Sequence, residues 1–420
     1  MSHHAAPVRQ RFWTPGACLL LAIVAVGLFF AARRYMFGIG AISNLSDEWP
    51  WGIWIAIDVA SGVALAAGGF TTAALAHVFH RGQYHALVRP ALITAMLGYT
   101  FVALGLLVDL GKFYNIWHPL LPSMWSGHSV LFEVGICVMC YLTVLYIEFM
   151  PLVVERFRGR VALPGVLRAL NRSLELLLTL FDRTLGRVMA LFIIAGVLLS
   201  CLHQSSLGAL MVIVPYKMHP LWHTPILPLL FLMSALAVGF PMVVVESMWA
   251  SRAFGRRPEM ELLRPLAKII PSLLMIYLAF KLGDMVIRET YRLLWPLNGV
   301  SAMFLLELFG GVVTPLLMLL NSRVRRTPHL LLIASVLVVL GVVVNRINVF
   351  LVAYTPVYGN QSYVPHIGEI AVTAGLVSGL VLAYRALVVV FPVLPEEAAV
   401  EADRESEREC DIEVIEPACS

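Results

Sequence analysis

The stretch WPWGIWIAIDVASGVALAAGGF (Trp49–Phe70) places a single carboxylate, Asp58, inside an apolar run long enough to enter a membrane. A charged side chain in hydrocarbon is costly unless it pairs or faces water, so an acid in this position indicates a functional site. Alanine and glycine recur through the stretch and allow neighbouring helices to pack closely beside the acid. Trp54 lies one turn before Asp58, where an indole ring is placed to stack on a flat ligand. We therefore predict a membrane helix that carries both residues into a binding site.

The composition of the whole chain is that of a protein that crosses the bilayer many times. Of its 420 residues, 60% are hydrophobic and 13% are charged, and the mean hydropathy is +0.84. Ten segments hold the roughly 20 mostly apolar residues that a membrane helix needs: 16–34, 51–76, 88–110, 127–151, 186–206, 224–248, 266–287, 299–321, 329–349 and 369–391. Every apolar run is long and uniform, which favours helices over barrel strands. We predict an all-α integral membrane protein with ten transmembrane helices, within a polytopic domain of residues 1–395.

Positive charge is distributed unequally between the loops that connect these helices. The even-numbered loops hold 16 arginines, whereas the odd-numbered loops hold 6 arginines and lysines in all. Short loops rich in arginine and lysine stay on the cytoplasmic side of a membrane. We therefore predict that the even-numbered loops and both termini are cytoplasmic. Arg33 and Arg34, in the first loop, run against this rule.

The odd-numbered loops are instead rich in tryptophan, tyrosine, histidine and proline, as in KFYNIWHPLLPSMWSGH (Lys112–His128) and YTPVYGNQSYVPH (Tyr354–His366). Six of the nine tryptophans fall on this face: Trp49, Trp51, Trp117, Trp125, Trp222 and Trp295. An interfacial belt of aromatic residues is the plainer interpretation, but such a belt forms on both sides of a membrane protein. Because the enrichment is one-sided, we predict a docking surface for another protein.

Two segments on the predicted cytoplasmic side are polar. Residues 396–420 are acidic and lack an apolar face, so we predict a disordered tail. Residues 155–185 alternate arginine with leucine, as in RALNRSLELLLTLFDR (Arg168–Arg183). That pattern is typical of an amphipathic helix that lies on the inner leaflet.

A faint internal repeat relates helices that are four apart. The third predicted helix ends in VDLGKFYNIWHPL (Val108–Leu120), and the next helix carries Glu133. The seventh ends in GDMVIRETYRLLWPL (Gly283–Leu297), and the next helix carries Glu307. Each unit thus has an aspartate, a loop with tryptophan and proline, and a glutamate. We predict two four-helix bundles, helices 2–5 and 6–9, flanked by helices 1 and 10, with a site between the halves.

Eight ionisable residues interrupt or border the predicted helices. Nearly all of them lie near the end of their helix that adjoins the odd-numbered loops. They are Asp58, Asp109, Glu133, His203, Lys281, Asp284, Glu307 and Arg346. With a helical rise of about 1.5 Å per residue, Asp58, Glu133 and Glu307 lie at similar depth, roughly 10 Å below the odd-loop surface. Among the other acids, only Glu148 and Glu246 lie clearly in the opposite half.

Three interpretations of this cluster compete. Structural ion pairs explain a single residue, but eight buried charges at one depth are costly unless all are paired. A haem-carrying cytochrome needs paired histidines at matching depths; only His128 and His203 come close, so no haem is expected. Cys137 and Cys140 form a C-x-x-C without a second pair, so no metal site is predicted either. A quinone takes up two protons with two electrons, so carboxylates or imidazoles must lie near its ring oxygens.

The quinone interpretation assigns roles to particular residues. The candidate catalytic, proton-handling groups are Asp58, Glu133, Asp109 and Glu307. The candidate contacts to the bound ring are Trp54, Asp58, His128, Glu133 and His203.

Several long blocks of the sequence resemble the NrfD/polysulfide reductase family. They are Trp49–Phe70, Arg89–Leu120 and His128–Glu155, with shorter agreement at His203–Ile213, Asn345–Phe350 and Glu369–Gly375. The resemblance covers helices 2–10. Within the family, the sequence is similar to the ten-helix, haem-free membrane subunit of hydrogenase-2-type nickel–iron hydrogenases.

The resemblance implies a subunit that is not catalytic alone and works in anaerobic respiration. It would exchange electrons between a periplasmic, ferredoxin-like iron–sulfur subunit, served by a catalytic subunit of hydrogenase type, and menaquinone or ubiquinone. The protein would lie in the bacterial cytoplasmic (inner) membrane, in contact with lipid and not with nucleic acid, and proton translocation stays open. A proton- or cation-coupled secondary transporter is the alternative, since it would use the same buried acids and the same repeat.

Overall fold

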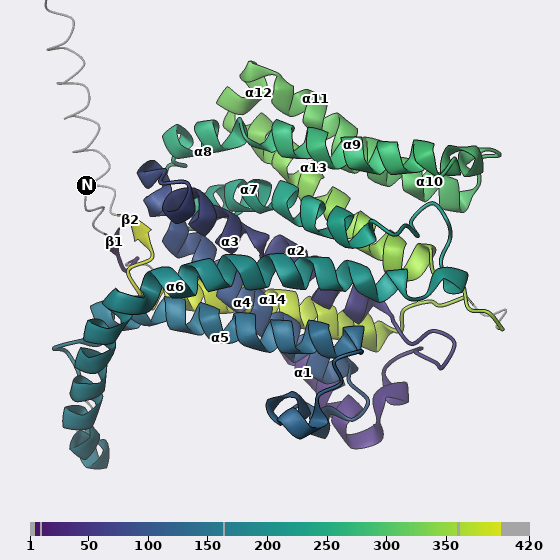
Figure 1. Ribbon diagram of the computed structural model, residues 1–420. Coiled ribbons are helices and arrows are strands. Elements are labelled where there is room, and N and C mark those ends of the chain that lie inside the picture. Colours follow the sequence, from purple (N-terminus) through teal and green to yellow (C-terminus); the bar gives the residue numbers. More distant parts are fainter. Residues whose placement is uncertain (1–4, 9–10, 163, 359–361, 396–420) are drawn as a thin grey trace, which may run out of the picture.

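The computed structural model describes residues 5–8, 11–162, 164–358 and 362–395, and it is almost entirely helical (Figure 1). Ten helices in this part of the chain are long and apolar enough to cross a membrane, which confirms the predicted fold class. The tail at 396–420, predicted to be disordered, lies outside the described residues.

Five of the ten spans are single α-helices. They are α1 (Pro15–Phe37), α5 (Val130–Phe157), α6 (Asn171–Val212), α7 (Leu227–Ala253) and α14 (Ile367–Val390). The third span is α4 (His85–Asp109), entered through the 3-10 turn η4 (Gly82–Tyr84). Their ends follow ordinary capping chemistry, because the Thr14 and Ser129 side chains accept hydrogen bonds from the first turns of α1 and α5.

The other four spans are interrupted. The second comprises the π-helix η2 (Trp54–Ser61), α2 (Gly62–Leu65), α3 (Ala67–Ala73) and the π-helix η3 (Ala74–Val78). The seventh comprises α8 (Met260–Ala267) and α9 (Ile270–Ile287). The eighth joins α10 (Gly299–Leu305), the π-helix η11 (Leu306–Val313) and α11 (Thr314–Leu320). The ninth joins α13 (Pro328–Ile347) to the π-helix η12 (Asn348–Val352). Because π-helical turns occur mostly at functional sites, these segments are the first places to search for one.

Helix α7 lies at the centre of the packing. It contacts α6 and α3 from the first half of the chain and α9 and α13 from the second half. Helix α1 packs along α14 at the edge, and α14 packs on α4. The flanking position of helices 1 and 10 stays a prediction, because α14 contacts both α4 and η2. The division into two separate four-helix bundles stays a prediction, since α7 joins the halves closely.

Two pairs of glycines allow helices to touch along their backbones. A Cβ atom added to Gly311 would lie 2.4 Å from the Cα atom of Gly341, so η11 and α13 meet there without side chains between them. A Cβ added to Gly27 would lie 2.9 Å from the Cα of Gly375, where α1 meets α14. Small residues at membrane helix crossings permit this close approach.

The two ends of the molecule differ in chemistry. The aromatic end, with loops 110–129, 213–226, 288–298 and 353–366, exposes large rings at its surface, including Tyr216, Trp295 and Tyr358. The arginine-rich end, with loops 79–84, 158–170, 254–259 and 321–327, lies at the left in Figure 1. There the strands β1 (Ala5–Ala6) and β2 (Leu394–Pro395) pair antiparallel.

Candidate functional site

The candidate acids are carried by different spans and lie in three separate environments. Asp58 lies in η2, Glu133 in the first turn of α5 and Glu307 in η11. Within the described residues, no hydrogen bond or ion pair links these three carboxylates to one another. The predicted site residues therefore do not converge on one cavity.

The first environment surrounds Asp58, whose side chain is 8% exposed. Thr373 of α14 donates a hydrogen bond of 2.8 Å to the carboxylate of Asp58. Gly105 of α4 faces the acid closely, since an added Cβ would lie 3.2 Å from the Cβ of Asp58. Asp109, one turn further along α4, interacts electrostatically with Asp58 and has a buried oxygen without a hydrogen-bond partner in the described residues.

Glu369, in the first turn of α14, extends this environment toward the aromatic end. It is fully buried and accepts hydrogen bonds from the Tyr363 hydroxyl and from the backbone N–H of Asn44 at 2.9 Å. Burial raises the pKa of Tyr363, and donation to Glu369 raises it further, so this phenol stays protonated and continues to donate. The indole of Trp54 donates to the Glu369 backbone carbonyl at 3.3 Å and has no exposed surface. Trp54 is thus packed between helices, and neither face of its ring is open to a ligand.

The second environment is the surface of α5 and α6. Glu133 is exposed in the first turn of α5, close to the aromatic end, and the Ser206 hydroxyl of α6 donates a hydrogen bond to it. Its place in the first turn of α5 stabilises a carboxylate through the helix dipole. His128 lies just before α5 and is exposed.

A cluster of buried polar groups lies inward from Glu133. His203 of α6 is fully buried, and neither of its ring nitrogens has a hydrogen-bond partner within the described residues. Its ring lies 5.7 Å from that of Tyr99 on α4, which in turn packs on Tyr141 of α5 at 4.5 Å. The Tyr99 hydroxyl faces Ser200 of α6, although no hydrogen bond of ordinary length forms between them in the described residues. Cys137 lies one turn after Glu133 on α5, between the surface acid and this cluster.

Buried polar groups continue toward the arginine-rich end. Thr94 lies five residues before Tyr99 on α4, which is about 7.5 Å along the helix. Its hydroxyl faces Glu246 of α7, and Tyr384 of α14 faces the same carboxylate. Buried polar groups without protein partners are usually hydrogen-bonded to ordered water. Buried polar groups on α4, α6, α7 and α14 therefore occur at several depths between Glu133 and the arginine-rich end.

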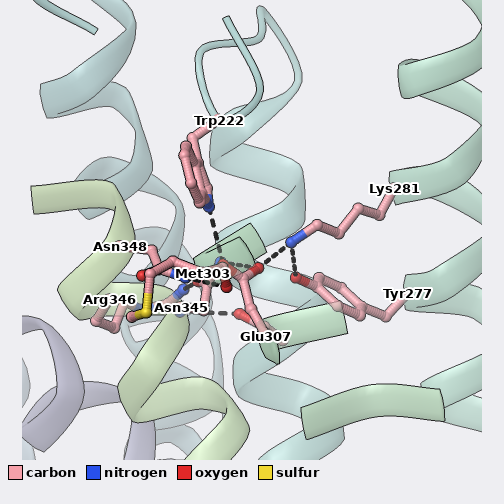
Figure 2. Close-up of polar contacts among 9 residues, drawn as sticks. Trp222, Tyr277, Lys281, Met303, Glu307, Asn345, Arg346 and Asn348 are labelled. Carbon is pink, nitrogen blue, oxygen red and sulfur yellow. Dashed lines mark hydrogen bonds and ion pairs between the residues drawn. The ribbon is translucent and has the colours of Figure 1, made fainter. Parts of the chain in front are cut away.

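The third environment surrounds Glu307 and is closed (Figure 2). Four donors converge on its carboxylate: Lys281 of α9, the Trp222 indole at 2.8 Å, Asn345 at 2.7 Å and Asn348 at 2.8 Å. Glu307 is 1% exposed and Lys281 is 7% exposed. Lys281 also donates to the Tyr277 hydroxyl at 3.4 Å. A buried ion pair is tolerated only when its remaining hydrogen-bonding capacity is used, and here the four donors satisfy the Glu307 carboxylate. Within the described residues, the Oδ1 atom of Asn348 has no partner.

Two further charged groups border the Glu307 network. Arg346 of α13 is fully buried; it donates to Ser234 at 2.8 Å, and its guanidinium lies 3.6 Å from the centre of the Phe231 ring. Asp284 of α9 accepts from Arg288 and from Thr224 at 2.7 Å. A cavity of about 20 Å³ lies between Lys281 and Asp284, which is room for one water molecule.

The structure also places residues that sequence reasoning did not select. The sequence does not single out Glu369, because an acid at the third position of a helix usually serves as part of the N-terminal cap. In the structure Glu369 does form this capping box with His366. Tyr99 lies in a long apolar run, where a single tyrosine is typical of a packed interior and indicates no particular function. The partners of Glu307 come from four elements, so only the packed structure brings them together.

Comparison with known proteins finds one family. The family model described as "Polysulphide reductase, NrfD" matches residues 42–357. A Nitratidesulfovibrio vulgaris protein whose name states no function is 38% identical over 93% of this chain and 97% of its own length. The "Probable Ni/Fe-hydrogenase 2 b-type cytochrome subunit" of Escherichia coli is 32% identical over 94% of this chain and 96% of its own. The "Menaquinone reductase, integral membrane subunit" of N. vulgaris is 28% identical over 89% and 90%, respectively.

Proposed function

The chain belongs to the NrfD family, as its sequence motifs predicted, and we propose that it is the quinone-reactive membrane subunit of a respiratory oxidoreductase complex. In this proposal it passes electrons between an iron–sulfur subunit, docked at the aromatic end, and quinone in the bilayer. The names of two relatives, a menaquinone reductase subunit and a hydrogenase 2 subunit, support the reaction class and favour a hydrogenase-type partner.

One observation carries the proposal: an exposed carboxylate in the first turn of α5 lies beside a buried imidazole, His203, whose ring nitrogens have no hydrogen-bond partner within the described residues. A quinone reaches its site through lipid, and its two-electron reduction consumes two protons. In this proposal the ring approaches Glu133 from the bilayer, and Ser206 holds the carboxylate in place. Tyr99 and His203 lie behind it, and the ring nitrogens of His203, unpartnered within the described residues, fit hydrogen bonding to water or to a ring oxygen.

In this proposal Glu133 exchanges a proton at its carboxylate with the ring oxygen that it faces, and Asp58, in its separate environment on η2, is a second candidate for the same function. A titratable group within hydrogen-bond reach of the reacting oxygen contributes about 10²–10⁴-fold in rate. The buried polar groups at Thr94, Glu246 and Tyr384 lie toward the arginine-rich end, so protons can come from that side. Glu246→Gln should then slow quinone reduction in membranes, and an unchanged rate would remove this route.

The buried His203 and the neighbouring His77 and His85 do not fit a haem held by two imidazoles. His203, deep among the spans, faces Tyr99 and not a second histidine. The rings of His77 and His85 contact each other at 4.7 Å, which leaves no space for a porphyrin between them. Although one relative is named a b-type cytochrome subunit, no step of the proposed reaction uses a haem. A stoichiometric haem absorbance from the purified complex would contradict this assignment.

The proposed orientation places the aromatic end in the periplasm and the arginine-rich end and both termini in the cytoplasm of a bacterial cell. It rests on the excess of arginine in the even-numbered loops. The exposed rings of Tyr216, Trp295 and Tyr358 then form part of the surface on which a ferredoxin-like partner docks. Reporter fusions at Pro119 and Tyr358 should read as periplasmic, and those at Arg160 and Arg257 as cytoplasmic. The reverse pattern would reject this orientation.

Asp58→Asn tests the proposed function in the complex purified from membranes with its native partners. The amide preserves the shape of the side chain but removes its titratable proton. Electron transfer to quinone should fall by about 100-fold, while the catalytic partner still reduces a soluble dye. Glu155→Gln is a matched control, because Glu155 is an exposed acid at the arginine-rich end, away from the proposed docking surface, and pairs with Arg89. Parallel loss of both activities in Asp58→Asn would instead make Asp58 a packing residue.

A further inference from the structure

The first part of α6 is longer than a membrane crossing requires. The helix runs for 42 residues from Asn171 to Val212, which is about 63 Å at 1.5 Å per residue. The hydrocarbon core is only about 30 Å thick. Residues 190–212 alone cover that thickness, and they expose a lipid-facing row that includes Leu191, Ile194 and Leu198. Residues 171–189, named here the α6 arm, therefore extend beyond the crossing.

The α6 arm turns away from the bundle. Figure 1 shows the beginning of α6 at the lower left, at the arginine-rich end, running crosswise to the membrane-spanning helices. The sequence predicted a separate amphipathic helix on the membrane surface within 155–185. In the structure this segment is instead shared between the end of α5, a loop and the arm, and the arm is continuous with the fifth span.

The acidic residues of the arm are occupied by contacts within the chain. Asp182 forms an ion pair with Arg158, just after α5. Glu175 accepts a hydrogen bond of 2.7 Å from the backbone N–H of Gly159. These contacts border a groove of about 750 Å³ between the arm and the end of α5. Glu155 also lines the groove. The groove therefore carries a net negative charge, which disfavours the binding of an anionic ligand there.

The opposite side of the arm combines apolar and basic residues. Arg172, Leu176, Leu180, Arg183 and Arg187 follow one another at intervals of four, four, three and four residues, which places them in one row along a helix. Leu176 is 64% exposed and Leu180 is 62% exposed, so no other part of the described chain covers this row. The three arginines are exposed as well.

We propose that this row is a binding surface for anionic phospholipid headgroups in the leaflet at the arginine-rich end. The leucines enter the boundary between headgroups and acyl chains, and the arginine stems extend along it so that the guanidinium groups meet lipid phosphates. Because the acids of the arm are engaged on the other side, the exposed row is purely basic and matches a negative surface. The row is continuous with the lipid-facing surface of the same helix, which favours lipid over a soluble protein as its partner.

Hydrogen exchange of the full-length protein in lipid nanodiscs tests this inference. One set of discs contains phosphatidylcholine only, and the other contains phosphatidylcholine with phosphatidylglycerol. Amides of residues 171–187 should exchange at least tenfold more slowly in the anionic discs, since each arginine near an anionic surface adds to the attraction. The difference should shrink at high salt, which screens exposed charges.

Arg172→Gln/Arg183→Gln/Arg187→Gln should abolish the difference between the two discs. A matched control, Arg264→Gln/Arg323→Gln/Arg326→Gln, removes the same charge from exposed sites at the same end and should retain it. Equal exchange of the arm in both discs would overturn the proposal, as would a difference that persists in the first variant. Protection found in native membranes but not in anionic discs would show that a protein covers the row instead.

Discussion

Glu133 and Glu307 occupy matching places in the two halves of the chain, but their surroundings are opposite. Each follows an aspartate and a loop with tryptophan and proline, and each lies near the aromatic end of its span. Glu133 is exposed and receives one side-chain hydrogen bond, from Ser206. Glu307 is buried and receives four, one of them from Lys281.

This difference shows that the same repeated sequence pattern can place a glutamate in two different environments, one exposed and one buried. An exposed carboxylate beside an unpartnered imidazole can take up and release a proton. A carboxylate neutralised by a lysine and held by three neutral donors cannot do so without disrupting its network. We therefore assign exchange chemistry to the first half and a fixed, structural charge to the second. The following changes are ordered by the size of the effect expected.

Lys281→Met should lower the stability of the protein more than the other changes, because it leaves Glu307 buried without its counter-charge. Removing one partner of a buried pair costs about 3–5 kcal/mol. We expect little assembled protein in the membrane and a clearly lowered melting temperature for what remains. The double change Lys281→Met/Glu307→Leu removes both charges and should recover much of the loss. A single variant as stable as the parent would show that the network is not closed.

Gly311→Ala tests how tightly the second half is packed around its acid. The added methyl group would meet the backbone of Gly341, and such overpacking costs about 1–3 kcal/mol. Thermal unfolding of the purified protein should record the loss. Gly310→Ala is the matched control, since its new methyl group lies no closer than 3.7 Å to a neighbour, and it should leave the melting temperature nearly unchanged. Equal stability of the two variants would mean that η11 and α13 are free to separate.

Ser206→Ala tests the surroundings of Glu133 in the first half, and its effect on activity should be the smallest of the three. It removes the single donor to Glu133, worth about 1 kcal/mol for an exposed or partly exposed hydrogen bond. The variant should fold normally and reduce quinone several-fold more slowly. The KM for quinone should rise, while the activity with the soluble dye should stay unchanged. A loss as large as that from removing the carboxylate itself would mean that Ser206, and not Glu133, contacts the ring.

The sequence predicted the spans well because each is a long apolar run, and only their boundaries moved. For example, the fifth span was expected at 186–206, but α6 begins at Asn171, since the amphipathic arm continues the same helix. The candidate acids were also visible, because a charge in an apolar run is conspicuous. Their surroundings were not: whether Glu307 meets Lys281 depends on the rotation of two helices, and π-helical turns such as η11 shift that rotation.

Trp54 also shows that the sequence does not reveal which side chains are accessible in the folded protein. Its spacing from Asp58 suggested a stacking surface, but the contacts with Ile42, Val108 and Val372 that bury it come from three distant segments. Glu369 was recognisable only as a cap. Long-range contacts of this kind decide which polar residue is accessible, and no local pattern encodes them.

The central claim is that Glu133 exchanges protons with quinone whereas Glu307 does not. The most direct measurement is the ratio of quinone activity to dye activity for Glu133→Gln and Glu307→Gln, determined on the same membranes with the native partner. Glu133→Gln should lower this ratio on the order of 100-fold at an unchanged amount of complex. Glu307→Gln should lower both activities together with the amount of assembled complex and leave the ratio unchanged. A selective loss of quinone activity in Glu307→Gln, with Glu133→Gln unaffected, would contradict the account.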